Sequence, residues 1–209
     1  MIHNKIFGLF AALAVTLAVA PQSQASTIFS LNQDACTGTC GTGPFGTVTL
    51  TEFGSGASAT VGVNVTLAAN ERFAGTGAGD ALEFNVIGAV NITGITANFG
   101  IGPSPDTASA FGTFLHSVEC TTCQGGNAGN PAGPLNFTVG SATGVTIASF
   151  IVNSGGYFFA ADIVGNNGNT GNVGANGSTT VVPEPVSMGL VGSGLISIFF
   201  LRRRKNQLS

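Results

Sequence analysis

Alternation of apolar and polar residues is the feature that most constrains how this chain can fold. The segment ATVGVNVTL at 59–67 places Val61, Val63, Val65 and Leu67 on one face and Thr, Gly and Asn on the other. A period of two residues is typical of a β-strand with one buried face. Further segments that we expect to be strands lie at 46–52, 81–88, 91–100, 111–120, 135–140 and 156–165.

Short strands separated by turn-forming residues predict an all-β body. Glycine occurs 32 times, and Gly-, Pro- and Asn-rich stretches separate the strand-like segments. This spacing favours an antiparallel β-sandwich, jelly-roll-like in its packing of two sheets. We expect the body to span residues 26–165, with 145–153 either a strand or a short helical turn. The Gly- and Asn-rich stretch at 166–180 is interpreted as a flexible linker.

The first 25 residues have the pattern of a secretory signal peptide. Lys5 precedes an apolar stretch at 6–20, and small residues follow it. A small-x-small site also ends at Ala20, but Pro21 would follow that cut, so we predict cleavage by signal peptidase between Ala25 and Ser26. The alternative is an uncleaved N-terminal anchor.

The charge of the body argues against a nucleic-acid partner. Between Ser26 and Val182 eight acidic residues accompany a single base, Arg72, so the net charge is about −7, against −3 for the whole chain. Phosphate binding needs several Lys or Arg side chains. Such an acidic surface suits calcium or neutral sugars better than nucleic acid or anionic lipid.

Four cysteines form two close pairs in the sequence, Cys36 with Cys40 and Cys120 with Cys123. In an exported chain this pattern favours disulfides over a zinc site. Four cysteines allow three connectivities, and both local pairing and cross pairing between the two motifs stay open, with local pairing slightly favoured.

No combination of residues in the sequence specifies a catalytic site, and we assign no catalytic residue, metal or cofactor. His116 lies inside a strand pattern with Phe114 and Val118, where a packed role is more common than that of a base. Calcium could be held by Asp80, Glu83 or Asp162 with loop carbonyls, although no D-x-D-x-D-G loop occurs.

The segment after residue 180 has three parts in a fixed order. VVPEP at 181–185 contains Pro183, Glu184 and Pro185; an apolar run of 16 residues, Val186 to Leu201, follows; the basic cluster Arg202, Arg203, Arg204 and Lys205 comes last. As a helix the run would rise roughly 24 Å, less than the roughly 30 Å of a bilayer core. The positive-inside rule predicts that the basic cluster stays in the cytoplasm and the body outside.

This arrangement at 181–205 resembles the PEP-CTERM sorting signal of Gram-negative bacteria. The resemblance implies that Pro183, Glu184 and Pro185 are the recognition motif, that 186–201 is a single transmembrane helix, and that Arg202 to Lys205 are the cytoplasmic stop. It also implies removal of the tail by exosortase, a membrane-embedded, transpeptidase-like protease. A GPI signal or a plain C-terminal anchor are the rival interpretations, but GPI signals normally end in apolar residues.

The resemblance implies an exported protein that is transiently anchored in the inner membrane and then reaches the cell surface or extracellular matrix. We expect a structural body, not an enzyme, associated with exopolysaccharide or biofilm. The alternatives are a carbohydrate-binding module, with or without calcium, and a secreted hydrolase. The absence of Trp and the presence of one Tyr weaken the sugar-binding alternative, because sugars stack on exposed aromatic rings.

Overall fold

The computed structural model describes residues 24–77 and 79–182, and within them nearly all regular structure is extended. The elements in chain order are β1 (Ser26–Ser30), β2 (Gln33–Asp34), β3 (Gly46–Phe53), η1 (Gly56–Ser58), β4 (Thr60–Leu67), β5 (Arg72–Phe73), β6 (Leu82–Val86), β7 (Asn91–Thr93), β8 (Phe99–Ile101), β9 (Asp106–Ala108), β10 (Gly112–Phe114), β11 (His116–Cys120), β12 (Leu135–Gly140), η2 (Ile147–Ser149), β13 (Phe150–Ile151), β14 (Phe159–Val164), β15 (Thr170–Ala175) and β16 (Ser178–Val182).

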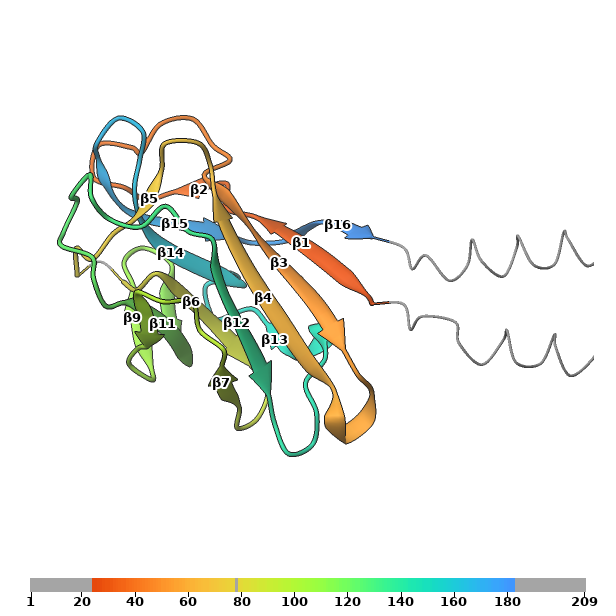
Figure 1. Ribbon diagram of the computed structural model, residues 1–209. Helices are drawn as coiled ribbons and strands as arrows, with labels where there is room; N and C mark the ends of the chain where they lie inside the picture. The colour runs from red at the N-terminus through yellow and green to blue at the C-terminus, as the bar shows by residue number, and fades with distance from the viewer. Residues whose placement is uncertain (1–23, 78, 183–209) are drawn as a thin grey trace, which may run out of the picture. The chain divides into compact units, whose positions relative to one another are not determined.

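The strands form two antiparallel sheets and a separate hairpin (Figure 1). One sheet has the order β16-β1-β3-β4-β12-β7 and the other follows β2-β15-β14-β6-β11-β8, with β13 added to β6 and β5 to β14. The hairpin consists of β9 and β10. The chain crosses repeatedly between the sheets, for example from β4 to β6 and from β11 to β12, so each sheet is built from distant segments.

The two sheets share one apolar core, which makes the body a sandwich. Val61, Val63 and Val65 of β4 are buried, as the alternation predicted, and they pack in the same cluster as residues of the second sheet. Rings join the sheets directly: Phe84 of β6 stacks on Phe137 of β12 with centroids 5.5 Å apart. The prediction of an all-β body with antiparallel sheets is confirmed, and the jelly-roll detail stays a prediction.

The strand predictions are correct in position, but two of the predicted strands are divided. The segment 91–100 forms β7 and the start of β8 with a turn between them, and 111–120 forms β10 and β11, separated at Leu115. The ambiguous segment 145–153 contains both predicted alternatives, because η2 is followed at once by β13.

The interpretation of 166–180 as a flexible linker is wrong. Residues 170–175 form β15, which pairs with β14 along its whole length and buries Val173 and Ala175. Its glycines allow close packing rather than flexibility. A Cβ on Gly171 would lie 2.7 Å from the Cα of Cys36, and one on Gly174 would lie 2.9 Å from the ring of Phe111.

The body therefore extends past its predicted end at residue 165. Ala25–Val182 form one compact unit, and its last strand, β16, pairs with its first, so that Ser26 faces Val182. Among residues 24–77 and 79–182, no helix has the length and apolarity needed to cross a membrane. Apart from Gln24 and Ala25, the predicted signal peptide lies outside the described residues, as does the predicted helix from Val186 to Leu201.

Candidate functional site

Acidic side chains gather on the outer face of the eight-stranded sheet. Strand alternation places Leu82 and Phe84 of β6 in the core, so Glu83 between them projects to the other face. Asp162 of β14 has the same orientation, since Ala161 and Ile163 on either side belong to the core. Both carboxylates are nevertheless fully buried, with 0% of each residue exposed.

The β9–β10 hairpin covers the outer face of the eight-stranded sheet at Glu83 and Asp162, which is why these side chains are buried. Its Ala108, Phe111 and Phe114 form a second apolar cluster against Ala160 of β14. In the sheet register Ala160 faces Glu83, so the hairpin packs beside the acidic pair. The hairpin contacts this sheet through β10 with β6 and through β9 with β14, and Figure 1 shows β9 beside β11. The hairpin therefore removes water from acidic side chains that the sheet alone would leave exposed.

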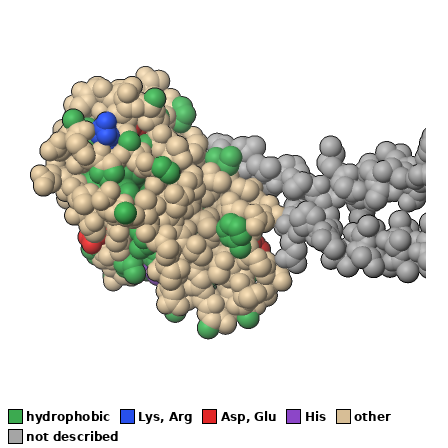
Figure 2. Space-filling view, viewed as in Figure 1, with side chains coloured by type: hydrophobic (Ala, Val, Ile, Leu, Met, Phe, Trp, Pro, Cys, Tyr) green, Lys and Arg blue, Asp and Glu red, His purple; other side chains and the backbone are tan. Residues whose placement is uncertain are grey.

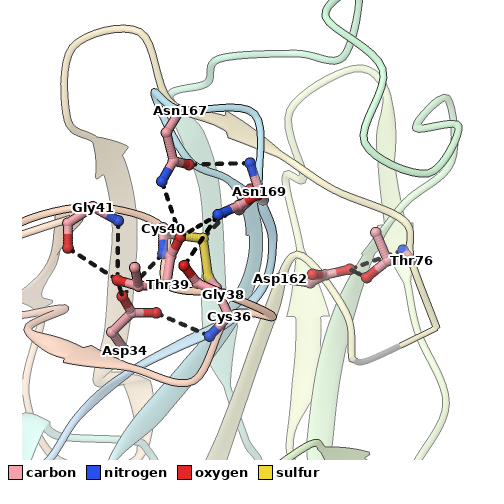
Figure 3. The surroundings of a disulfide bond; sticks show 10 residues. All are labelled: Asp34, Cys36, Gly38, Thr39, Cys40, Gly41, Thr76, Asp162, Asn167 and Asn169. Carbon is pink, nitrogen blue, oxygen red and sulfur yellow. Dashed lines mark hydrogen bonds between the residues drawn. A yellow bond between two sulfur atoms is a disulfide. The ribbon is translucent and has the colours of Figure 1, made fainter.

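Residues 74–77 and 79–80, between β5 and β6, are tied to the pair by hydrogen bonds. Asp162 Oδ2 accepts from the backbone N–H of Thr76 at 2.9 Å and from its hydroxyl at 2.7 Å, as Figure 3 shows. The Asp80 N–H donates to Glu83 Oε1 at 3.0 Å, and the Asp162 N–H donates to the Asp80 carbonyl at 2.8 Å. One loop thus links both carboxylates.

Two glycines allow the backbone to approach these carboxylates closely. A Cβ on Gly79 would lie 2.3 Å from Glu83 Oε1 and 3.0 Å from the side-chain oxygen of Asn172, the residue that faces Asp162 in the sheet. A Cβ on Gly102 would lie 2.2 Å from both Asp80 Oδ2 and Ser117 Oγ. Any larger residue at either position would displace a polar group of the cluster.

Burial dominates the electrostatics of the cluster. It raises the pKa of Glu83 well above its ordinary value; the N–H of Asp80 opposes this, and the charges of Asp106, Asp80 and Asp162 add to it. Burial also raises the pKa of Asp162, against the two hydrogen bonds from Thr76. The pKa of Asp80 is raised mainly by burial as well. These groups are costly to ionise without a nearby positive charge.

Three carboxylate oxygens of the cluster lack hydrogen bonds. Glu83 Oε2, Asp162 Oδ1 and Asp80 Oδ2 are buried and have no hydrogen-bond partner among the described residues. Arg72, the one Lys or Arg between residues 24 and 182, donates from Nη1 to the Asn130 carbonyl at 3.0 Å. The cluster is therefore an acidic, oxygen-lined site whose charge is not balanced by a basic side chain of the described body.

His116 lies on the opposite face of the sheet from this cluster. The register pairs His116 with Phe84 and Ser117 with Glu83, and the His116 ring lies 5.7 Å from the Phe84 ring. Burial lowers the pKa of the imidazole. The histidine is thus a packed residue, although Phe114 belongs to the hairpin cluster and not to its face.

The cysteines form the two local disulfides, Cys36–Cys40 and Cys120–Cys123. Asp34 organises the first loop: its Oδ1 accepts from the Cys36 N–H at 2.9 Å and its Oδ2 from the Cys40 N–H at 3.0 Å. Asn169 clamps the loop from the segment before β15, donating to the Thr39 carbonyl at 2.7 Å (Figure 3).

The Asp34 loop also brings together three atoms that could bind a metal ion, one each from Asp34, Cys36 and Cys40, all within 4.8 Å of one another. In the part of the chain that the structure describes, no other three donor atoms of Asp, Glu, Cys or His lie as close together. Two of the three donors are the sulfurs of a disulfide, which leaves no thiolate to bind a metal. The zinc alternative is therefore not supported by this loop.

Sequence reasoning named Asp80, Glu83 and Asp162 separately, and the structure brings them together. It missed Thr76, Gly79, Gly102, Ser117 and Asn172, which surround them. One sequence signal could have indicated this site: each of the apolar segments LEFNV and FAADIV contains a single acidic residue. A carboxylate that is buried in such a segment requires a polar or charged partner.

The predicted processing sites lie at the ends of the described body. Ser26 is the first residue of β1, and Ala25 precedes it. The predicted recognition residues Pro183, Glu184 and Pro185, and the basic cluster Arg202 to Lys205, lie outside the described residues. Val181 and Val182, the start of the predicted signal, belong to β16.

Comparison with known proteins identifies only the C-terminal segment. A family model, the PEP-CTERM protein-sorting motif, matches residues 181–205. No curated protein and no solved structure matches the chain. The motif implies export, membrane anchoring through the C-terminal segment and then processing by exosortase. The chain therefore carries a PEP-CTERM protein-sorting motif, which begins in the last strand of its β-sandwich body.

Proposed function

We propose that the chain is an exported, structural protein of the bacterial cell surface or extracellular matrix, associated with exopolysaccharide. The observation that carries the proposal is the sorting motif at 181–205. In this proposal signal peptidase cuts after Ala25, the C-terminal segment holds the body at the inner membrane, and exosortase then removes that segment.

The character of the body supports a non-catalytic role. His116 and the acidic cluster lie on opposite faces of the sheet, so they do not form an acid–base pair. Figure 2 shows a face composed mostly of uncharged polar and backbone atoms, with small scattered apolar and charged spots. Such a surface is compatible with a hydrated polysaccharide matrix, and its negative charge disfavours nucleic acid.

Mass spectrometry of the protein from cells with and without exosortase tests the sorting step. We expect a mature form starting at Ser26 and lacking the basic cluster in wild-type cells, and a form retaining Arg202 to Lys205 in cells without exosortase. Glu184→Ala should prevent processing in wild-type cells, whereas Asn206→Ala, beyond the basic cluster, should not. An intact C-terminus in wild-type cells would refute the proposal.

A carbohydrate-binding role is the second candidate, and one observation favours it. A shallow groove on the six-stranded sheet is lined by hydroxyl and amide groups, among them Thr60, Asn91, Thr93 and Thr138. One observation weakens this role: sugars stack on exposed aromatic rings, and Phe53, 41% exposed, is the one ring among the large apolar side chains exposed on the described body.

A glycan array with and without calcium separates the structural role from the carbohydrate-binding role. Binding that Thr93→Ala and Thr138→Ala abolish would support the groove; no binding to any polysaccharide would exclude it.

A further inference from the structure

The buried acidic cluster is a feature that sorting and a structural role leave unexplained. Glu83 and Asp162 are fully buried, they come from neighbouring strands, and each has one oxygen without a hydrogen bond in the described body. Burying a carboxylate without a partner is costly, and proteins tolerate it where the group is protonated or coordinates a metal. The cluster must therefore hold either protons or a cation.

The chemical type of the donor atoms around the two carboxylates indicates which cations the site would bind. All are oxygens: the carboxylates of Glu83 and Asp162, the Asp80 carbonyl, and the side-chain amide oxygen of Asn172 near Gly79. Oxygen donors suit hard cations such as Ca²⁺ and Mg²⁺ and not zinc or copper. Ca²⁺ accepts irregular shells of carboxylate, amide and carbonyl oxygens, whereas Mg²⁺ demands a near-ideal octahedron and keeps most of its water.

Charge and geometry limit the number of carboxylates that share the ion. Outside the Asp34 loop, no three acidic, Cys or His donor atoms of the described residues lie within 4.8 Å of one another, which is about the span across one Ca²⁺ ion. Two carboxylates balance the charge of one divalent cation. Asp80 Oδ2 also lacks a hydrogen bond, but Asp80 is only partly buried, whereas Glu83 and Asp162 are fully buried and each has one oxygen without a hydrogen bond.

We propose that Glu83 and Asp162 bind one Ca²⁺ ion between the eight-stranded sheet and the β9–β10 hairpin, with neutral amide and carbonyl oxygens completing its shell. The ion joins β6 to β14 next to Thr76 and Asp80, which are already hydrogen-bonded to Asp162 and Glu83, respectively. Exported proteins meet calcium at high concentration, and binding modules outside the cell work with Kd values of about 10⁻⁴ to 10⁻³ M. The proposal does not depend on the sorting step.

Calorimetric titration of the full chain in a mild detergent, with calcium chloride after treatment with EDTA, tests the proposal directly. We expect one saturable site with a Kd of about 1 mM or below, and weaker binding of magnesium. Glu83→Gln and Asp162→Asn should each weaken calcium binding at least about tenfold. Glu52→Gln is the matched control, because Glu52 lies on β3 of the other sheet, and it should bind as the wild type does.

Thermal unfolding separates loss of binding from loss of folding. In EDTA, Glu83→Gln should melt at or above the wild-type temperature, because it removes a buried charge but keeps the shape of the side chain. In about 10 mM calcium the order should reverse, since only the wild type gains stability from the ion. The proposal is wrong if calcium leaves the wild-type melting temperature unchanged, or if both variants respond to calcium like the wild type; either result would assign the cluster to shared protons.

Discussion

At the scale of single residues, buried carboxylates make the stability of this body depend on pH. Glu71 is the clearest case: it is buried, and its Oε2 has no hydrogen-bond partner in the described structure. Burial raises its pKa from 4.5 to about 7, and the charge of Asp34 adds to the effect. The folded state therefore binds this proton more tightly than the unfolded chain does.

Glu71→Gln tests this linkage. Because the folded-state pKa lies above the unfolded value, the contribution of Glu71 is fully present below pH 4.5 and is lost as the pH rises to about 7. In EDTA we expect the free energy of unfolding of the wild type to fall across this window, and that of Glu71→Gln to fall less. Urea unfolding at several pH values measures both curves, with Glu52→Gln as the control. Parallel curves for the wild type and Glu71→Gln would contradict the assignment.

At the scale of elements, β15 shows how glycine can mark a strand instead of a flexible segment. It lies between β14 and β2, and the loop after β2 crosses closely over its first residues. Gly171 has a φ of +146° and faces the backbone at Cys36, so both its conformation and its surroundings exclude a side chain. A strand with such close contacts requires glycine, and a flexible linker is also rich in glycine, so composition alone does not distinguish the two.

Gly171→Ala should destabilise the protein by about 2 kcal/mol or more, since the new Cβ would overlap the Cys36 backbone and strain φ. Gly177→Ala is the matched control, because a Cβ there meets nothing within 4 Å, and it should change stability by less than about 0.5 kcal/mol. Urea denaturation of the two variants measures the difference. Equal stability of both would mean that β15 is not held against the Cys36–Cys40 loop.

At the scale of the whole molecule, the two ends of the body meet in one sheet. β1 lies between β3 and β16, so the first strand after the predicted signal-peptide cleavage site is paired on both sides. The last strand ends at Val182, one residue before the Pro-Glu-Pro motif. Both predicted recognition sites therefore lie directly beside a strand of the folded sheet.

This arrangement predicts where the body can be truncated. A fragment of residues 26–182 should unfold cooperatively, whereas residues 26–165 should show no cooperative transition. The shorter fragment loses β15 and β16, so β14 and β1 each lose one pairing partner, β2 loses its partner β15, and the core that Val173 covers is exposed. Differential scanning calorimetry distinguishes the two. A cooperative transition for 26–165 at the same temperature would show that the last two strands are dispensable.

The sequence by itself determined the properties that depend on near neighbours along the chain. Alternation in 59–67 depends on residues two apart, so it located β4 correctly. The spacing of Cys36 and Cys40 favoured a local disulfide, and the linear order of motif, apolar run and basic cluster at 181–205 was sufficient to recognise the sorting signal.

Only the tertiary structure decided the properties that depend on contacts between distant segments. In the sequence alone, Gly171 fits a flexible linker as well as a strand. Only the structure shows that the backbone of Cys36 occupies the space where a side chain would lie. Glu83 and Asp162 are 79 positions apart, and sheet pairing together with the covering hairpin makes them one buried site. Their burial, and with it the need for a proton or a cation, follows from packing and not from the local pattern.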